Sequence, residues 1–593
     1  MSDFIFSKKP IKDGIITKKF QDIYNENLTS VREVHTKFGT LAIIDNHYNG
    51  FSNYETDEII FSVVGGPVLL FRDNNFISNK NSNEGTYSIY DRWMNKNQIK
   101  WDKDLSGPFI VIFFNKKKGS LKIICDIMSF IPVYLNNNDS DLLIGSHINL
   151  LGSISKNKID KTSIVDLILN EIITFPFTAF KNITQISPAS INNWSLNEID
   201  GKFKQNIYWE PIEPKNKISL RKLSNKLNRS FNNYINCVSN VESSIGSFFS
   251  GGEDSRTVID KLNQNNKVDS FVFSENLNRE TYIASKVNNV YKTNLTICKR
   301  QKSYYYDILA PSSNLIGICG DYAHSHVFNL AAKYNLKKYD VFMGGFLSDT
   351  LLKGHHIKLK TIPKYLKFLP IRESKFVTKN INIKYHKLFN NDIIDLINSR
   401  RNNHLSKLKK IRPKSYIEWF SIWPISQHND APNIHCNRRL LNIFEPFTDV
   451  NIIKIASQAS QEQKLNKYLF NMAMKPFLKK TKLIPHSNGS YPYFSWYLNI
   501  YFKFIYKIYK SLKRLLFQDK IYSGSWVEWN KFINEKSFKS FFKKTYKFIN
   551  LELGSHLYKS CESILNEKIL TVSQKRMLIQ ISYHLSIIKK KQP

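Results

Sequence analysis

The segment Ser247-Phe248-Phe249-Ser250-Gly251-Gly252-Glu253-Asp254-Ser255-Arg256 lies between a predicted strand and a predicted helix. Its two glycines allow backbone amides to approach phosphate oxygens, and its serines add hydroxyl donors near the positive end of the helix. The Asp254 carboxylate would repel phosphate by itself, so its position indicates a magnesium ion that bridges the phosphates. The alternative is an ordinary strand-to-helix turn with a capping serine. The segment therefore predicts a loop that binds phosphate groups and carries a metal ligand.

Strand and helix signals alternate on both sides of this loop. Strands are expected at 245–249, 270–273 and 339–343, and helices at 220–238, directly after the glycines, and near 281–291. Such alternation is typical of a doubly wound parallel sheet. Beyond Trp419 the chain is expected to be mostly helical.

The chain before this sheet has a different pattern. Up to about Trp209 it consists of short strands separated by turns, such as 58–64 and 108–114. A chain of 593 residues is also too long for a single core. We therefore predict a multi-domain α/β protein, whose expected parts are a β-rich domain at 1–209, a proline-containing linker at 210–219, an ATP-binding domain at 220–495 and a helical basic region at 496–593.

The formal net charge is +37, from 86 Lys and Arg residues against 49 Asp and Glu residues. Because lysine is abundant along the whole chain, we interpret the excess as a compositional bias and expect no stable nucleic-acid complex. Residues 497–517 interleave apolar and basic residues and predict a basic amphipathic helix. We expect it to pack against the domain with its lysines in water, and peripheral contact with an anionic membrane is the alternative.

Cysteine spacing and the apolar segments bear on the cellular compartment. The six cysteines are scattered and include no CxxC pair, which argues against structural zinc and a disulfide framework. The first residues contain no apolar signal region, and no run of about 18 uncharged apolar residues occurs. These features predict a cytoplasmic protein.

The loop resembles the SGGxDS motif of the ATP pyrophosphatase group, and other segments narrow the resemblance to asparagine synthetase and its relatives. In chain order, the matching segments are 125–134 (RDxxGxxPLY in the family), 145–151 (ASEIKAL), 180–188 (FKGIxxLPPG), Tyr208-Trp209, 343–351 (LSGxGxDEL) and 445–449 (PFLD). The resemblance covers roughly residues 55–495. Only the SGGxDS motif is highly specific by itself.

The resemblance implies a glutaminase-like αββα domain and a synthetase domain in which ATP adenylates a carboxylate before an amine displaces AMP. It implies that Asp254 and Asp349 bind Mg²⁺. It further implies that ATP contacts Ser250, Gly251, Gly252, Ser255 and Gly345, with the strand Phe271-Val272-Phe273 along the adenine.

The chain departs from the family at residues that carry its chemistry. The family hydrolyses glutamine with an N-terminal cysteine at position 2, whereas this chain has Ser2, so we expect no glutaminase activity. The general base of the second loop is replaced by Phe346. The family's late RxKxGF segment falls on 484–490, where Ser487 occupies the lysine position, although Lys480 or Lys482 could reach in from the preceding turn.

Histidines and arginines could supply the missing groups. His324, in a His-x-His sequence with His326, could replace the base or bind a metal, and His486 is a second candidate base. Ordinary packed or surface histidines are the alternative for these residues and for His355-His356. Arg438 and Arg439 could clamp a phosphate or a substrate carboxylate, or simply lie on a helix surface.

These observations lead to one hypothesis with two alternatives. The first is an ATP- and Mg²⁺-dependent, asparagine synthetase-like ligase that joins a small-molecule or peptide carboxylate to an amine or ammonia. The alternatives are an RNA-modifying adenylating enzyme of the same group and a non-catalytic ATP-binding homologue. The sequence names neither the acid nor the amine.

Overall fold

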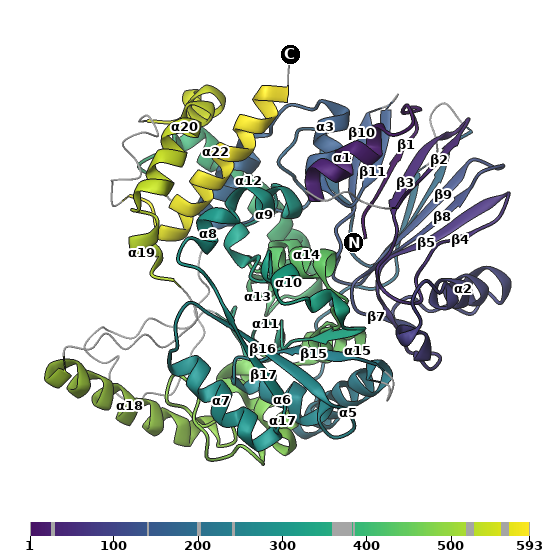
Figure 1. Cartoon of the computed structure of the whole chain (residues 1–593). Coiled ribbons are helices and arrows are strands. Elements are labelled where there is room, and N and C mark those ends of the chain that lie inside the picture. The colour runs from purple at the N-terminus through teal and green to yellow at the C-terminus, as the bar shows by residue number, and fades with distance from the viewer. Residues whose placement is uncertain are drawn as a thin grey trace.

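The computed structural model describes residues 2–24, 30–138, 141–197, 203–239, 243–357, 382–383, 386–517, 527–558 and 569–591. An antiparallel β sandwich built from the first part of the chain packs beside an α/β part that contains a parallel sheet (Figure 1). The described residues 208–219 form neither helix nor strand and connect the two parts.

The sandwich consists of two six-stranded antiparallel sheets. The first has the order β12 (Ile183–Gln185), β10 (Tyr134–Asn138), β11 (Asp141–Gly145), β1 (Phe4–Ser7), β3 (Gly39–Ile44) and β2 (Val31–Thr36). The second has the order β14 (Phe203–Ile207), β13 (Ser190–Ser195), β9 (Ser120–Cys125), β8 (Phe109–Asn115), β5 (Ile59–Gly65) and β4 (Tyr54–Glu55).

The alternation of side chains along each strand explains the layers. On β1, Phe4 and Phe6 belong to the apolar cluster between the sheets, whereas Ile5 belongs to the cluster on the opposite face. Helices α1 (Ile15–Tyr24) and α3 (Ile148–Ser155) cover that outer face, and α2 (Glu84–Tyr90) contacts β5 of the second sheet. The predicted αββα arrangement is confirmed.

The parallel sheet has the order β17 (Asn294–Lys299), β16 (Val268–Ser274), β15 (Ile245–Phe248) and β18 (Val341–Met343). Helices α6 (Glu253–Leu262) and α7 (Arg279–Tyr291) connect the first three strands in chain order, and a segment with α8 (Tyr304–Asp307), α9 (Leu309–Ile316) and α10 (Leu330–Lys333) returns the chain to β18. The expected strands and helices are confirmed, and α5 spans Leu220–Val238 as predicted. Strand β17 was not among the expected elements.

The rest of the described chain is mostly helical, as predicted. Its longer helices are α12 (Asn391–Ile411), α14 (Ala431–Leu440), α15 (Val450–Gln458), α17 (Tyr468–Met474), α18 (Trp496–Phe517), α20 (Lys536–Leu553) and α22 (Val572–Lys591). Helix α22 packs against α20, α9 and α4 (Lys161–Asn170), so the end of the chain contacts both parts (Figure 1). Within the described residues, no helix combines the length and the apolar character needed to cross a membrane.

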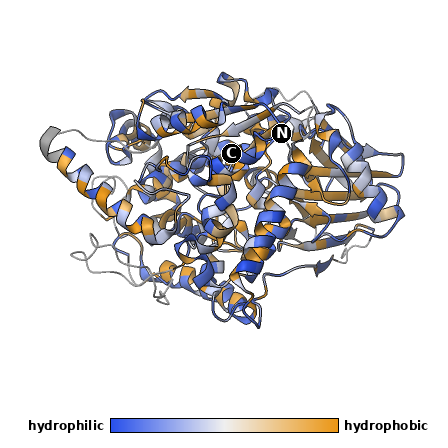
Figure 2. Ribbon diagram, turned by 90° about the horizontal axis from the view of Figure 1, so that it is seen from below, coloured by the Kyte–Doolittle hydropathy of each residue, from blue (hydrophilic) through white to orange (hydrophobic). Residues whose placement is uncertain are grey.

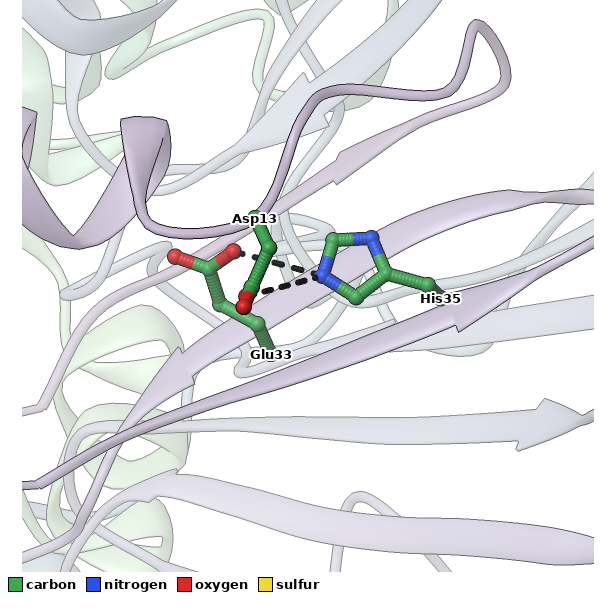
Figure 3. Close-up of side chains that lie close together, drawn as sticks. All are labelled: Asp13, Glu33 and His35. Atoms are coloured by element: carbon green, nitrogen blue, oxygen red, sulfur yellow. Dashed lines mark hydrogen bonds and ion pairs between the residues drawn. The ribbon is translucent and has the colours of Figure 1, made fainter.

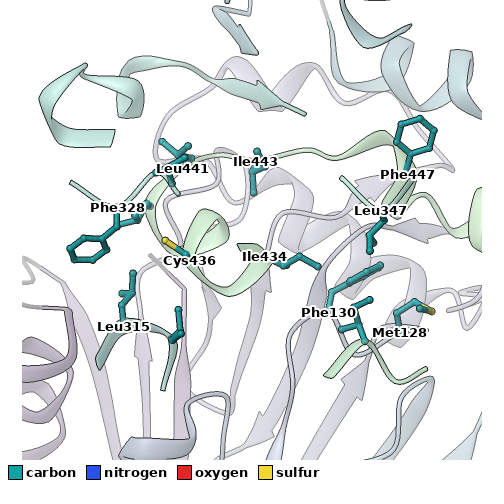
Figure 4. Close-up of a cluster of buried hydrophobic side chains, with 14 of the residues drawn as sticks. Met128, Phe130, Leu315, Phe328, Leu347, Ile434, Cys436, Leu441, Ile443 and Phe447 are labelled. Carbon is teal, nitrogen blue, oxygen red and sulfur yellow. The ribbon is translucent and has the colours of Figure 1, made fainter. Parts of the chain in front are cut away.

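The two parts share a buried apolar cluster. Met128 and Phe130 of the sandwich belong to the same cluster as Leu347 and Ile434 of the α/β part (Figure 4). Polar contacts reinforce it, because Trp423 Nε1 donates to the Ile127 carbonyl at 2.9 Å. The two parts therefore pack as one body.

A small polar cluster ties the first helix to an edge strand. His35 Nε2 on β2 lies 3.3 Å from Asp13 Oδ1 and 3.4 Å from Glu33 Oε2 (Figure 3). The Glu33 carboxylate also accepts hydrogen bonds from the Gly14 and Thr17 amides at the start of α1. Because these amides occupy both oxygens of Glu33, capping of the helix accounts for the cluster.

The cysteines of the described part are free thiols, namely Cys125, Cys237, Cys298, Cys319 and Cys436. Cys561 lies outside the described residues. The expectation of no disulfide framework agrees with these five residues.

Candidate active site

Residues 250–255, which the resemblance implies bind ATP and which are called the ATP loop below, follow β15 at the point where the order of strands reverses. Strands β15 and β18 are parallel neighbours, with Ser247 paired to Met343, so the loops after them begin side by side. Open α/β sheets bind ligands in the crevice at such a reversal. A Cβ atom on Gly345 would lie 2.5 Å from Asp254 Cβ, so only glycine allows the second loop to approach α6 this closely.

The conformation of the first loop depends on Gly251. Its φ is +71°, and a Cβ atom there would lie 2.9 Å from the Ala284 amide nitrogen. Ser250 Oγ accepts a hydrogen bond from the Gly252 amide at 3.2 Å, and Ser255 Oγ donates to the Gly252 carbonyl at 3.1 Å. Helix α6 begins directly afterwards, so its positive end faces the loop.

A buried arginine fixes the back of this loop. Arg256 Nε donates to the Gly251 carbonyl at 2.8 Å, Nη1 donates to the Ile484 carbonyl at 2.7 Å, and Nη2 donates to the Pro485 carbonyl at 2.9 Å. One guanidinium therefore joins the ATP loop to the segment that resembles the family's RxKxGF element. Burial lowers the pKa of Arg256 to about 10, so the group stays charged at neutral pH.

Three carboxylates meet beside the loop. Oxygen atoms of Glu253, Asp254 and Asp349 all lie within 4.8 Å of one another. The buried Lys353 ammonium contacts all three carboxylates. Its Nζ lies 2.8 Å from Glu253 Oε1 and 3.0 Å from Asp349 Oδ1, and it also pairs with Asp254 Oδ1. Lys467 also contacts Glu253. The two aspartates that the resemblance implied as metal ligands therefore come together, although 95 positions separate them in the sequence.

The three carboxylates of this cluster differ in the direction of their pKa shifts. Burial raises the pKa of Asp254 to about 6; the Lys353 ammonium opposes that shift, and the Asp349 and Glu253 carboxylates add to it. Burial also acts to raise the pKa of Glu253 and of Asp349, but the Lys353 and Lys467 ammonium groups together outweigh it and lower both pKa values. Clustered oxygen ligands that stay ionised at neutral pH suit Mg²⁺.

A cavity of about 460 Å³ opens over the loop. Such a volume lies in the range of small-molecule sites. The predicted residues that line it are Ser250, Asp254, Ser255, Phe271, Val272, Phe273, Gly345 and Asp349. Arg300, His326, Asn433 and Asn437 are among its other lining residues. The loop, the strand expected along the adenine and both aspartates thus face one space.

Glu445 contributes a further carboxyl group to this cavity. Glu445 Oε2 accepts a hydrogen bond from the Phe346 amide at 3.1 Å. Burial raises the pKa of Glu445 to about 7, against the opposing effect of hydrogen bonds from the Phe346 and Gly344 amides. A titratable carboxyl therefore lies beside the position where Phe346 replaces the family's base.

The histidines and lysines proposed from the sequence lie in different surroundings. His326 lines the cavity, whereas His324 is not among the described lining residues and contacts Asp430 Oδ1 at 3.1 Å through Nδ1. His324 ends a 3₁₀ helix and His326 lies in the turn that follows, so neither lies on a strand. His486 Nε2 lies near Gly252, 3.4 Å from the position of an added Cβ, and burial lowers the pKa of His486 to about 4.

Lys482 is exposed and is not among the described residues that line the cavity. Lys480 pairs with Asp260 at 3.3 Å instead of reaching the loop. The cations that contact the carboxylate cluster are Lys353 and Lys467, and the sequence analysis did not predict either of them. Lys353 follows Asp349 by four positions on one helical turn, a spacing that could have revealed it.

Arg438 and Arg439 match neither alternative from the sequence, a clamp on phosphate or a substrate carboxylate or a position on a helix surface. Arg438 and Arg439 are buried, and both bind the Asp3 carboxylate, with Arg439 Nε 2.6 Å from Asp3 Oδ2. Burial acts to raise the pKa of Asp3, but the two guanidinium groups outweigh it and hold that pKa far below its ordinary value. These arginines therefore join the two parts of the chain rather than facing the ATP loop.

The same contacts enclose residue 2. Ser2 is fully buried, its Oγ accepts a hydrogen bond from the Gly65 amide at 3.2 Å, and its carbonyl accepts one from Arg438 at 2.6 Å. A glutamine-hydrolysing nucleophile needs an open approach for its substrate. Residue 2 therefore carries a hydroxyl instead of a thiol, and its side chain is enclosed by these contacts.

Comparisons with known proteins add little to this geometry. No protein-family model and no curated protein matches the chain. An NH₃-dependent NAD synthetase from Campylobacter jejuni is 16% identical with a TM-score of 0.16, and the match covers 23% of this chain and 60% of that one. A glutamine phosphoribosylpyrophosphate amidotransferase from B. subtilis is 8% identical with a TM-score of 0.21, and the match covers 50% and 84% of the two chains. At TM-scores this low, neither similarity bears on function.

Proposed function

We propose that the chain is an ATP-dependent, amide-forming ligase similar to asparagine synthetase. It would activate a carboxylate by adenylylation and join it to an amine or ammonia, with release of AMP and pyrophosphate. The observation that carries this proposal is the single cavity onto which Ser250, Phe271, Asp254 and Asp349 all open. These residues belong to the ATP loop, the neighbouring strand and the second loop.

The residues of the cavity divide the work of binding ATP. Asp254 and Asp349 would hold Mg²⁺, which neutralises phosphate charge when it is bound. The loop amides and the hydroxyl groups of Ser250 and Ser255 would bind the pyrophosphate portion of the substrate. Arg256 keeps those donors in place through its hydrogen bonds to the backbone.

Glu445 is the best-placed general base for the second half-reaction. An attacking amine must lose a proton as it forms the amide bond, and Glu445 Oε2 lies in the cavity beside Phe346. A carboxyl with a pKa of about 7 can accept that proton near neutral pH. His324 and His486 remain alternative bases, and Lys482 remains a candidate for charge stabilisation.

The amine donor would enter from solution. A hydroxyl stands where the resemblance implied a thiol, and Ser2 is enclosed by the Asp3, Arg438 and Arg439 contacts, which supports a ligase without its own glutamine hydrolysis. A ligase of this kind uses free ammonia or an amine carried by its second substrate.

An ATP–pyrophosphate exchange assay tests the proposal. Purified protein is incubated with ATP, Mg²⁺, labelled pyrophosphate and members of a carboxylic-acid panel, and label appears in ATP only if an acid is adenylated reversibly. Asp254→Asn and Asp349→Asn should abolish exchange, whereas Asp260→Asn, on the same helix as Asp254 but outside the cavity, should retain it. Intact ATP binding with no exchange for any acid would favour a non-catalytic homologue.

A further inference from the structure

Helix α18 exposes an apolar stripe along its length. Its exposed members, with exposed fractions of 45–61%, are Tyr497, Leu498, Tyr501, Ile505, Ile508, Tyr509 and Leu512. The positions 498, 501, 505, 508 and 512 repeat every three or four residues and therefore lie on one face of the helix. The helix extends from the body of the molecule, and hydrophobic residues recur along it (Figures 1 and 2). The expectation that this face packs against the domain is wrong.

The opposite side of the helix is basic. Between Trp496 and Phe517 the sequence has five cations, namely Lys503, Lys507, Lys510, Lys513 and Arg514, and no Asp or Glu. At 100° per residue, Lys503, Lys507 and Lys510 lie on the side away from Ile505. The helix thus combines a Tyr-, Ile- and Leu-containing face with an opposite side on which every charged residue is a cation.

Contacts along one flank fix which way the stripe points. Phe502 packs against Tyr491 with ring centroids 4.9 Å apart, and the Arg279 guanidinium lies 4.4 Å from the centre of the Tyr506 ring. Both contacts lie beside the apolar stripe rather than on it. The body of the protein therefore holds α18 by its flank and leaves the stripe toward solvent.

We propose that α18 is an interfacial helix that binds an anionic lipid surface. An apolar face with aromatic residues inserts at the boundary between headgroups and acyl chains, while the cations add attraction to anionic lipids. The net charge of +37 supports the same attraction. A protein partner would need an acidic groove of matching length, whereas a membrane needs only the apolar stripe and the positive charge.

Vesicle co-sedimentation of the full chain tests the stripe. We expect at least tenfold tighter binding to phosphatidylcholine vesicles that contain phosphatidylglycerol than to pure phosphatidylcholine vesicles, and weaker binding at high salt. The double substitution Ile505→Glu and Ile508→Glu should reduce binding at least tenfold. Leu551→Glu is the matched control, because Leu551 is an exposed apolar residue on α20. Circular dichroism verifies that each variant is folded.

A second pair of variants tests the charge. Lys507→Gln with Lys510→Gln should weaken binding, whereas Lys117→Gln with Lys118→Gln, at a distant turn after β8, removes the same charge and should leave binding unchanged. Equal binding by all variants, or no binding to anionic vesicles, overturns the proposal. The proposal is also overturned if analytical ultracentrifugation shows a dimer and the Ile505 and Ile508 substitutions dissociate it, because a second copy of the chain would then cover the stripe. None of these results depends on the ligase activity.

Discussion

Removal of the Lys353 ammonium should make the stability of the protein depend on Mg²⁺. This one cation contacts Glu253, Asp254 and Asp349, and its side chain is almost fully buried. Lys353→Met keeps an unbranched side chain that is one atom shorter and removes its charge. In this variant the three carboxylates face one another. Among the described residues, Lys467 is then the one cation that still contacts the cluster, through Glu253.

The size of the effect follows from the distances. At an effective dielectric constant of about 20, two unit charges 4.8 Å apart repel by about 3.5 kcal/mol. Asp254, whose pKa is already about 6, would take up a proton at neutral pH and thereby limit the sum of the three repulsions. Loss of one partner of a buried ion pair costs about 3–5 kcal/mol, and we expect a loss of that order in the free energy of unfolding.

Urea unfolding in EDTA and in MgCl₂ measures the effect. If the aspartates bind Mg²⁺ where Lys353 now balances their charge, Mg²⁺ should restore much of the lost stability in the variant and stabilise the native protein less. Lys464→Met is the matched control, because Lys464 is equally buried but contacts Glu418, outside the cluster. It should be destabilised without any response to Mg²⁺. Identical responses in both variants would refute the reasoning.

Three further substitutions test other parts of the site. Glu445→Gln should flatten the pH dependence of stability. The Glu445 carboxyl has a pKa of about 7 in the folded protein against an ordinary value of 4.5, so its contribution to the free energy of unfolding should fall by about 3 kcal/mol as pH rises from 4.5 to 7. Urea unfolding of the wild type and the variant at both pH values measures the difference. Arg256→Lys should weaken ATP binding at least tenfold in calorimetry, because an ammonium cannot span three carbonyls; unchanged affinity would contradict the clamp. Ser2→Cys should release no glutamate from glutamine, because the position is enclosed; measurable release in a coupled assay would contradict this.

Local patterns in the sequence were sufficient to predict the glycine loop and most strands and helices around it, although not β17. The bounds of α5 follow from apolar residues at helical spacing, such as Leu223, Leu227 and Phe231, and from Ser219, whose hydroxyl caps the helix. The ATP loop follows from glycines that the backbone requires, since Gly251 has a positive φ. Both signals are local, so a single sequence reveals them.

Groups whose role depends on distant partners could not be predicted. Glu445 accepts a hydrogen bond from the Phe346 amide, 99 positions away, and Arg439 binds the Asp3 carboxylate, 436 positions away. The periodicity of α18 showed that the helix is amphipathic but not which surface its apolar face meets. Pairings over such separations are set by the packing of the whole fold.

The cluster shared by the two parts has a consequence for how such a chain can change during evolution. Ser106 of the sandwich donates to Asp449 at 2.8 Å, and Asp449 caps α15 four residues after Glu445. The sandwich thus contacts the segment that carries Glu445, the base proposed for the neighbouring cavity. A change during evolution that deleted the sandwich would therefore expose Leu347 and Ile434 and remove the contact that holds this segment, even if the proposed reaction needed no glutamine hydrolysis.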